Sequence, residues 1–123
     1  MVIVTSEDVP AEYLEYLDKQ EISYIATGKG AIDLNRAVEI LTHTFGVHRL
    51  GIVGGAAINT GFLDAGLLDE IVLLIGAGID GRASFSPVFN RKEYSVPLKK
   101  LQLLEATGNP KTGSVLVRYK VLH

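Results

Sequence analysis

Residues 52–59 read Ile52-Val53-Gly54-Gly55-Ala56-Ala57-Ile58-Asn59, an apolar run that passes through two glycines into small residues. The preceding run, residues 50–53, predicts a buried strand, and residues 56–65 predict a helix that ends at Gly66. Glycine permits a tight turn and the close approach of a ligand, and the free amides at a helix start attract anions. The glycine pair therefore fits either a phosphate-binding turn or a tight connection that needs small residues for packing.

Strands and helices alternate in both directions from this turn. Apolar runs predict strands over residues 2–4, 23–27, 50–53 and 70–75. Helical spacing predicts helices over residues 10–20, from Asp33 to Phe45-Gly46, and over 56–65. Strands that alternate with helices indicate an α/β fold with a mostly parallel sheet flanked by helices.

The pattern changes after Gly76. Residues 76–97 predict no helix, and residues 101–107 and 115–122 predict a C-terminal antiparallel hairpin around a turn rich in glycine. No linker or long repeat interrupts the chain, so residues 1–123 are predicted to form a single domain.

Composition narrows the possible functions. The 123 residues are 47% hydrophobic, and 12 Lys+Arg against 14 Asp+Glu leave a net charge of −2. This balance predicts neither a nucleic-acid partner nor a membrane surface, and no apolar run approaches the roughly 18 residues that span a bilayer. The amino terminus lacks the basic start of a signal peptide, so we expect a cytoplasmic protein. The absence of cysteine excludes thiol catalysis, and His43, His48 and His123 suggest no metal site.

Polar residues follow the first two predicted strands. Thr5 and Ser6 come after the first, at the kind of strand end where open α/β sheets bind ligands. Capping of the next helix by Ser6-Glu7-Asp8, with Pro10 in its first turn, is the favoured role for these side chains. Lys29, in the Gly28-Lys29-Gly30 turn, is expected to be a solvated loop residue that can also reach an anion.

One basic residue follows the fourth predicted strand. Arg82, in Ile79-Asp80-Gly81-Arg82, can pair with a phosphate or carboxylate, although an exposed Asp-Gly turn is the simpler interpretation. Asp69 and Glu70 are adjacent and point to opposite faces of a strand, which indicates a helix-to-strand junction rather than an acid–base pair. No catalytic residue is identified.

The whole chain resembles the carboxyl-terminal reductase domain of bacterial riboflavin biosynthesis. The part of this resemblance that is most specific to the family runs from Gly51 through the glycine pair to Phe62-Leu63-Asp64-Ala65-Gly66-Leu67-Leu68-Asp69-Glu70-Ile71. Supporting similarities are Thr5-Ser6, Asp33-Leu34, Ile79-Asp80-Gly81-Arg82, Pro87-Val88-Phe89, Leu101 and Val117-Arg118-Tyr119. Members of this family have a dihydrofolate-reductase-like fold and use NADPH to reduce the ribose of a phosphoribosylamino-pyrimidine.

The resemblance assigns roles to particular residues. It implies that Gly54, Gly55, Ala56 and Ala57 contact the NADPH pyrophosphate. It places Thr5 and Ser6 near the adenosine ribose and its 2′-phosphate, and Gly81 and Arg82 near the pyrimidine-ribose substrate. Val53 stands where many of these reductases have glutamate, which leaves open another substrate such as a pterin.

The similarity covers mainly the later half of the family domain. Such a partial, dihydrofolate-reductase-like sheet exposes an edge, so we expect a homo-oligomer (a dimer) or an N-terminal segment to pair with it. The predicted function is therefore an NADPH-dependent pyrimidine reductase or its cofactor-binding fragment. The alternative is a non-catalytic remnant or binding module.

Overall fold

The computed structural model describes residues 1–92 and 95–123. These residues form two compact units, Met1–Ile52 and Val53–His123, and each is described by itself. Within the described residues, every helix is too short or too polar to cross a membrane.

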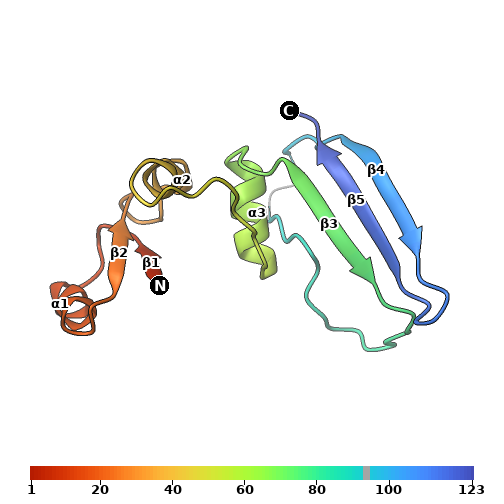
Figure 1. Cartoon of the computed structure of the whole chain (residues 1–123), viewed down its shortest axis with the longest axis horizontal. Helices are drawn as coiled ribbons and strands as arrows, with labels where there is room; N and C mark the ends of the chain where they lie inside the picture. Colours follow the sequence, from red (N-terminus) through yellow and green to blue (C-terminus); the bar gives the residue numbers. More distant parts are fainter. Residues whose placement is uncertain (93–94) are drawn as a thin grey trace. The chain divides into compact units, whose positions relative to one another are not determined.

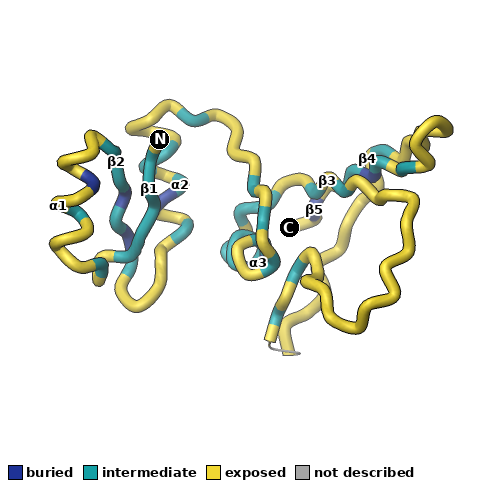
Figure 2. Tube along the Cα trace, turned by 90° about the horizontal axis from the view of Figure 1, so that it is seen from below, coloured by how far each residue is buried: buried dark blue, intermediate teal, exposed yellow. Residues whose placement is uncertain are grey.

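The first unit contains two parallel strands and two helices. Its elements are β1 (Val2–Thr5), α1 (Ala11–Lys19), β2 (Ser23–Ala26) and α2 (Leu34–His43). The strands pair in parallel register from Val2↔Ser23 to Thr5↔Ala26, and α1 and α2 lie on opposite sides of the pair (Figures 1 and 2). Leu17 of α1, Ile25 of β2 and Ala37 of α2 are buried and form the core of this unit. Both strands and both helices therefore lie where the apolar periodicity predicts them.

The two helices of this unit start differently. The carboxylate of Asp33 accepts a hydrogen bond from the backbone N–H of Arg36 at 3.0 Å, so Asp33 is the predicted N-cap of α2. α1 is preceded by Pro10 and has no side-chain cap, so the predicted capping by Ser6, Glu7 or Asp8 is wrong. The Asp8 carboxylate instead accepts a hydrogen bond from the backbone N–H of Gly30, which holds the turn after β2.

The second unit contains one helix and an antiparallel sheet. Its elements are α3 (Ala56–Asp64), β3 (Glu70–Ile75), β4 (Leu101–Gly108) and β5 (Val115–Val121). The sheet has the order β3-β5-β4, and β5 pairs antiparallel with both neighbours (Figure 1). The predicted C-terminal hairpin is confirmed, and its register shifts between Leu103 and Glu105. Outside residues 93–94, the stretch 76–97 contains no helix, as predicted.

Two predictions about the sheet need correction. A mostly parallel sheet is not confirmed, since β1 and β2 are the parallel pair and the other described strands are antiparallel. Residues 50–53 form no strand, although their apolar run predicts one, and the Val53 side chain is 98% exposed. A strand requires a neighbour for its backbone hydrogen bonds, and no described strand pairs with this run.

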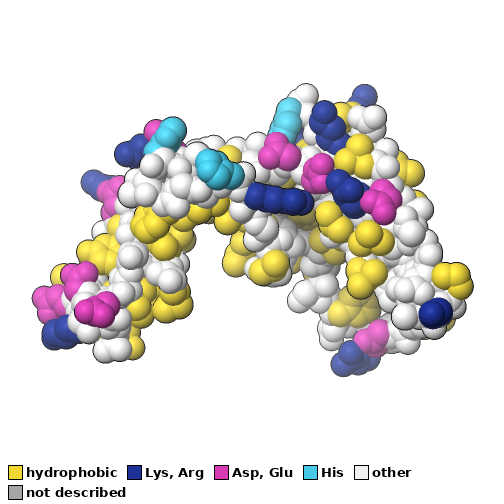
Figure 3. All heavy atoms as spheres, viewed as in Figure 1, with side chains coloured by type: hydrophobic (Ala, Val, Ile, Leu, Met, Phe, Trp, Pro, Cys, Tyr) yellow, Lys and Arg dark blue, Asp and Glu magenta, His cyan; other side chains and the backbone are white. Residues whose placement is uncertain are grey.

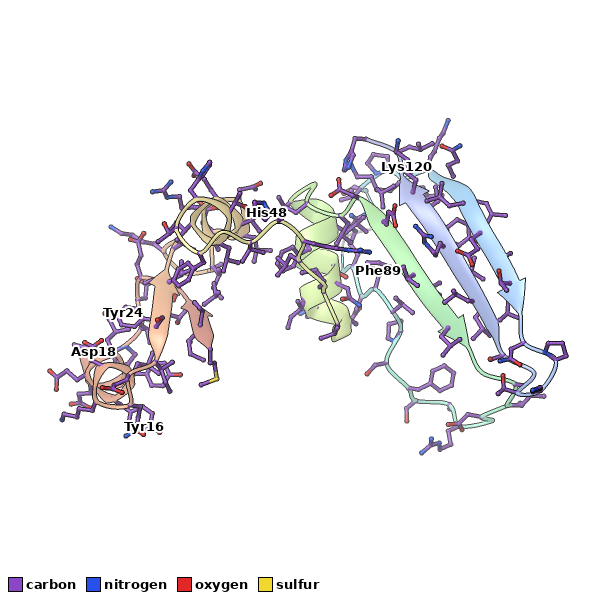
Figure 4. The ribbon with its side chains drawn as sticks, viewed as in Figure 1. Tyr16, Asp18, Tyr24, His48, Phe89 and Lys120 are labelled. Carbon is purple, nitrogen blue, oxygen red and sulfur yellow. The ribbon has the colours of Figure 1, made fainter. Side chains whose placement is uncertain are left out.

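The two faces of the antiparallel sheet differ in character. Val117 and Val121 of β5 are buried on one face, in the few dark segments of this unit in Figure 2. The opposite face presents Arg118 and Lys120, because neighbouring side chains of a strand alternate. Lys120 is labelled in Figure 4. Arg118 donates to the carboxylates of Glu70 on β3 at 3.1 Å and Glu105 on β4 at 3.3 Å, so one guanidinium links all three strands. In Figure 3, basic, acidic and hydrophobic side chains lie next to one another on the visible face of the second unit.

Candidate functional site

The start of α3 is an uncapped helix N-terminus that follows two glycines. Gly55 is the N-cap and supplies no side chain, and the first turn carries no acidic residue. Gly54 has φ +96°, a left-handed conformation that favours glycine, and the Gly54–Gly55 peptide bond is cis. A Cβ atom added at Gly55 would meet no other atom within 4 Å, so the space beside this backbone is open. Free amides, a positive helix end and open space are what an anionic group requires.

Polar side chains of α3 bind the segment at residues 88–91. The Asn59 side chain donates to the carbonyl of Val88 at 2.8 Å, and the Thr60 hydroxyl accepts from the backbone N–H of Asn90 at 2.8 Å. Arg91 forms an ion pair with Asp64, one turn further along the helix. No local motif points to Thr60, Asn90 or Arg91. The available signal was three polar residues within an otherwise apolar helix.

The loop after β3 presents an arginine with its own carboxylate. Arg82 binds Asp80 through its side chain and its backbone N–H, and its side chain is 81% exposed. The Arg82 side chain lowers the pKa of Asp80, with a smaller contribution from the backbone N–H. The Asp80 carboxylate in turn raises the pKa of Arg82. Asp80 and Arg82 are therefore paired in an exposed loop, which agrees with the simpler interpretation that this arginine lies in solvent.

The first unit brings the ends of β1 and β2 together. The Thr5 carbonyl accepts from the backbone N–H of Thr27 at 3.0 Å, and the Gly28 carbonyl accepts from that of Glu7 at 2.8 Å. Ser6 and the Gly28-Lys29-Gly30 turn thus lie at the same carboxyl edge of the parallel pair, as predicted. The buried Thr27 hydroxyl donates to the Asp33 carbonyl at 2.9 Å, which closes the turn against the start of α2.

The predicted residues are divided between the two units. Thr5 and Ser6 belong to the first unit, whereas Gly54 to Ala57, Gly81 and Arg82 belong to the second. Asp69 and Glu70 form the predicted junction with a strand, and Glu70 is engaged by Arg118. Among the described residues, no cluster of three or more acidic or histidine side chains is arranged to hold a metal ion.

Comparison with known proteins identifies the family. The model of the RibD C-terminal domain matches residues 1–110, which is most of the chain. The chain belongs to the RibD C-terminal domain family. The sequence resemblance to the reductase domain of riboflavin biosynthesis is thereby confirmed.

Individual relatives agree with this assignment. The chain is 35% identical over 80 residues to the 2,5-diamino-6-ribosylamino-4(3H)-pyrimidinone 5′-phosphate reductase of Methanothermobacter thermautotrophicus. Its fold is similar to that of a pyrimidine reductase-like protein from Corynebacterium diphtheriae, with a TM-score of 0.80 and 22% identity over 99% of this chain. It is also similar to Acinetobacter baumannii RibD, with a TM-score of 0.72 and 19% identity over 99% of this chain. The fold of the RibD-like reductases is therefore present in this chain.

These relatives are longer than the matched region. The alignments cover 36% of the Methanothermobacter reductase, 50% of the Corynebacterium protein and 37% of the Acinetobacter protein. The chain thus spans at most about half the length of these three relatives.

Proposed function

We propose that this RibD C-terminal domain chain binds NADPH and acts in the reduction of a phosphoribosylamino-pyrimidine of riboflavin biosynthesis. The supporting observation is the start of α3, where the glycine pair leaves open space beside amides that no side chain caps. Family membership supports the assignment of this site to a nicotinamide cofactor. The chain then serves as the cofactor-binding part of a reductase domain.

The residues at the start of α3 fit a pyrophosphate. The backbone amides of Ala56 and Ala57 belong to the first helical turn and have no partner within the helix. Gly54 and Gly55 carry no side chain that would keep a phosphate from the backbone. When bound, the cofactor supplies the hydride, and the chain contributes orientation and charge compensation.

Within the first unit, the carboxyl edge of β1 and β2 offers groups that suit a 2′-phosphate, the role that the family resemblance implies for Thr5 and Ser6. Thr5 and Ser6 supply hydroxyl groups, and Lys29 supplies a positive charge on a turn that Asp8 holds in place. A phosphate group on the ribose distinguishes NADPH from NADH, so these residues favour NADPH. Gly81 and Arg82 fit the phosphate of the pyrimidine substrate, because a guanidinium binds phosphate through two hydrogen bonds.

The first experiment measures NADPH binding to the full chain by calorimetry. Ala57→Glu places a carboxylate in the first turn of α3, where it stabilises the helix by about 0.3–1 kcal/mol and repels a phosphate. We expect about tenfold weaker binding without loss of thermal stability. Ala57→Gln is the matched neutral control and is expected to bind like the wild type. Absence of saturable binding by the wild type, or equal binding by Ala57→Glu, would contradict the proposed site.

The second experiment tests the choice of cofactor. Ser6→Asp brings a negative charge to the edge of β1 and is expected to weaken NADPH binding more than NADH binding. Ser6→Asn is the neutral control. If Ser6→Asp weakens both cofactors equally, the 2′-phosphate does not lie beside Ser6.

The third experiment follows turnover through the absorbance of the reduced nicotinamide. The pyrimidine substrate is compared with a pterin, and Arg82→Gln is expected to raise the KM for the phosphorylated substrate. Cofactor binding without turnover of either compound would support the alternative of a non-catalytic binding module. Preferential turnover of the pterin would overturn the assignment of the substrate.

A further inference from the structure

The turn after β2 is held against the segment after β1 by two hydrogen bonds of different kinds. The backbone N–H of Glu7 donates to the Gly28 carbonyl at 2.8 Å, and the backbone N–H of Gly30 donates to the Asp8 carboxylate. The first bond joins backbone atoms and does not depend on the side chains. The second joins residues 22 positions apart and requires an acceptor on the side chain of Asp8. One side chain therefore fixes the far end of the turn.

The two glycines of this turn are in different surroundings. Both have a positive φ, +80° at Gly28 and +73° at Gly30. A Cβ atom at Gly28 would lie 2.2 Å from the Ala31 carbonyl oxygen, whereas one at Gly30 would meet no atom within 4 Å. Packing thus confines the start of the turn but not its end. The Asp8 carboxylate holds the part of the turn that packing leaves open.

Lys29 lies between these two glycines and is exposed. The ion pairs found among residues 1–92 and 95–123 all involve other residues, so in this part of the chain no carboxylate is paired with Lys29. Glycine on either side gives the backbone of a lysine unusual freedom, and the loss of that freedom on binding a phosphate costs entropy. Because the bond to Asp8 fixes Gly30 in advance, part of this cost is removed before an anion binds.

We propose that Asp8 is a positioning residue for the cofactor: its carboxylate fixes Gly30 and thereby holds the Lys29 ammonium where it meets the 2′-phosphate of NADPH. This inference rests on the proposed function, which assigns that phosphate to Thr5, Ser6 and Lys29. A carboxylate repels a phosphate, so Asp8 acts through the turn and not by contact with the ligand. The preference for NADPH over NADH then depends on a residue that binds neither.

Geometry and charge make opposite predictions for one substitution. Asp8→Asn keeps an acceptor oxygen at the same distance from the backbone but removes the negative charge. If the hydrogen bond is what matters, this variant retains NADPH binding, and the loss of repulsion favours binding further. Asp8→Ala removes the acceptor and the charge together, so NADPH binding should fall even though the repulsion is gone.

The experiment measures the binding of NADPH and of NADH to the full chain by calorimetry. We expect Asp8→Ala to weaken NADPH binding about five- to tenfold and NADH binding less than about twofold. Asp8→Asn is expected to bind NADPH at least as tightly as the wild type. Asp18→Ala is the matched control, since Asp18 is an exposed carboxylate on α1 of the same unit (Figure 4). It is expected to leave both affinities unchanged.

A double substitution tests whether Asp8 acts through Lys29. Lys29→Gln removes the ammonium group and is expected to lower the preference for NADPH by itself. In that background Asp8→Ala should have no further effect on the preference, because the effects of two residues that act as one unit are not additive. A merely structural role for Asp8 would weaken both cofactors alike and would add to the effect of Lys29→Gln.

Two further measurements separate this role from overall stability. Amide hydrogen exchange should become faster at Gly30 in Asp8→Ala, while the amides of β2 keep their protection. Asp8→Glu retains the charge but moves the acceptor by one methylene group, and its preference for NADPH should also fall. This variant decides the question if Asp8→Ala folds poorly.

Three outcomes would overturn the proposal. An unchanged preference for NADPH in Asp8→Ala, with wild-type binding intact, would refute the positioning role alone. Equal losses in Asp8→Asn and Asp8→Ala would show that the charge, and not the acceptor, is what the cofactor requires. A wild type that binds neither cofactor would refute the proposed function, and the positioning role with it.

Discussion

The hydroxyl of Thr60 in α3 accepts a hydrogen bond from the backbone N–H of Asn90 at 2.8 Å. The same hydroxyl donates to the carbonyl of Ala56 at 2.8 Å, and Thr60 is only 8% exposed. This contact ties the helix that starts at the glycine pair to the segment that follows the Arg82 loop. The placement of that segment on α3 therefore depends partly on one buried hydroxyl.

Thr60→Val is expected to lower the free energy of unfolding by about 1–3 kcal/mol, because it leaves the Asn90 N–H without its acceptor. Urea denaturation followed by circular dichroism measures the change. Thr42→Val is the matched control, since the exposed Thr42 hydroxyl also donates to a carbonyl four residues earlier, that of Val38. It is expected to change stability by less than about 0.5 kcal/mol. Equal losses in both variants would contradict the role given to the bond with Asn90.

Gly28→Ala is expected to disrupt the turn after β2. A Cβ atom at Gly28 would lie 2.2 Å from the Ala31 carbonyl oxygen and 2.6 Å from the Asp33 amide nitrogen, both backbone atoms. We expect a loss of about 3 kcal/mol or more. Gly30→Ala is the control, because Gly30 also has a positive φ (+73°) but has no atom within 4 Å of an added Cβ. Its expected loss is about 1–2 kcal/mol, and a loss as large as that of Gly28→Ala would contradict the argument.

The Asp80 carboxyl is expected to titrate below its usual pKa of 3.8, because the Arg82 side chain stabilises its charged form. A lowered pKa means that the contribution of this pair to the loop is present at neutral pH. It is lost as the pH falls through the lowered pKa. NMR titration of the Asp80 carboxyl carbon measures the shift. Arg82→Gln should return the pKa toward 3.8, whereas Arg36→Gln, which removes the Arg36–Glu39 pair on α2, should leave it unchanged.

Arg118→Met is expected to lower the melting temperature of the sheet, because it removes the bonds to Glu70 and Glu105 and leaves two carboxylates on one face. The loss should shrink in about 1 M NaCl, which screens charges at this distance. Thermal unfolding at low and high salt measures both effects. Arg36→Met, which breaks an exposed pair with Glu39 on α2, is the control with little expected change. A loss that does not depend on salt would indicate packing of the Arg118 side chain instead of charge.

Local signals in the sequence predict the secondary structure of the first unit well. The Asp33 cap, the apolar run 2–4 and the helical spacing around Leu17 all correspond to observed features. Capping by Ser6 to Asp8 was wrong because Asp8 binds Gly30, which is distant in the sequence. A short window cannot show that a polar side chain has a better partner elsewhere.

Local signals also predict only part of the candidate site. The glycine pair at the start of α3 is a local motif, and its backbone follows from the residues themselves. The bonds from Asn59 and Thr60 to Val88 and Asn90 join residues 29 and 30 positions apart. No local pattern specifies such partners.

The sequence by itself determined where the observed helices and strands lie, the glycine turn and membership in the RibD C-terminal domain family. These depend on backbone preferences and on apolar periodicity, which act over a few residues. Only the tertiary structure decided that β5 lies between β3 and β4, that Arg118 joins three strands, and that residues 50–53 have no strand beside them. Pairing in a sheet depends on hydrogen bonds between distant segments, and an apolar run becomes a strand only where such a partner is present.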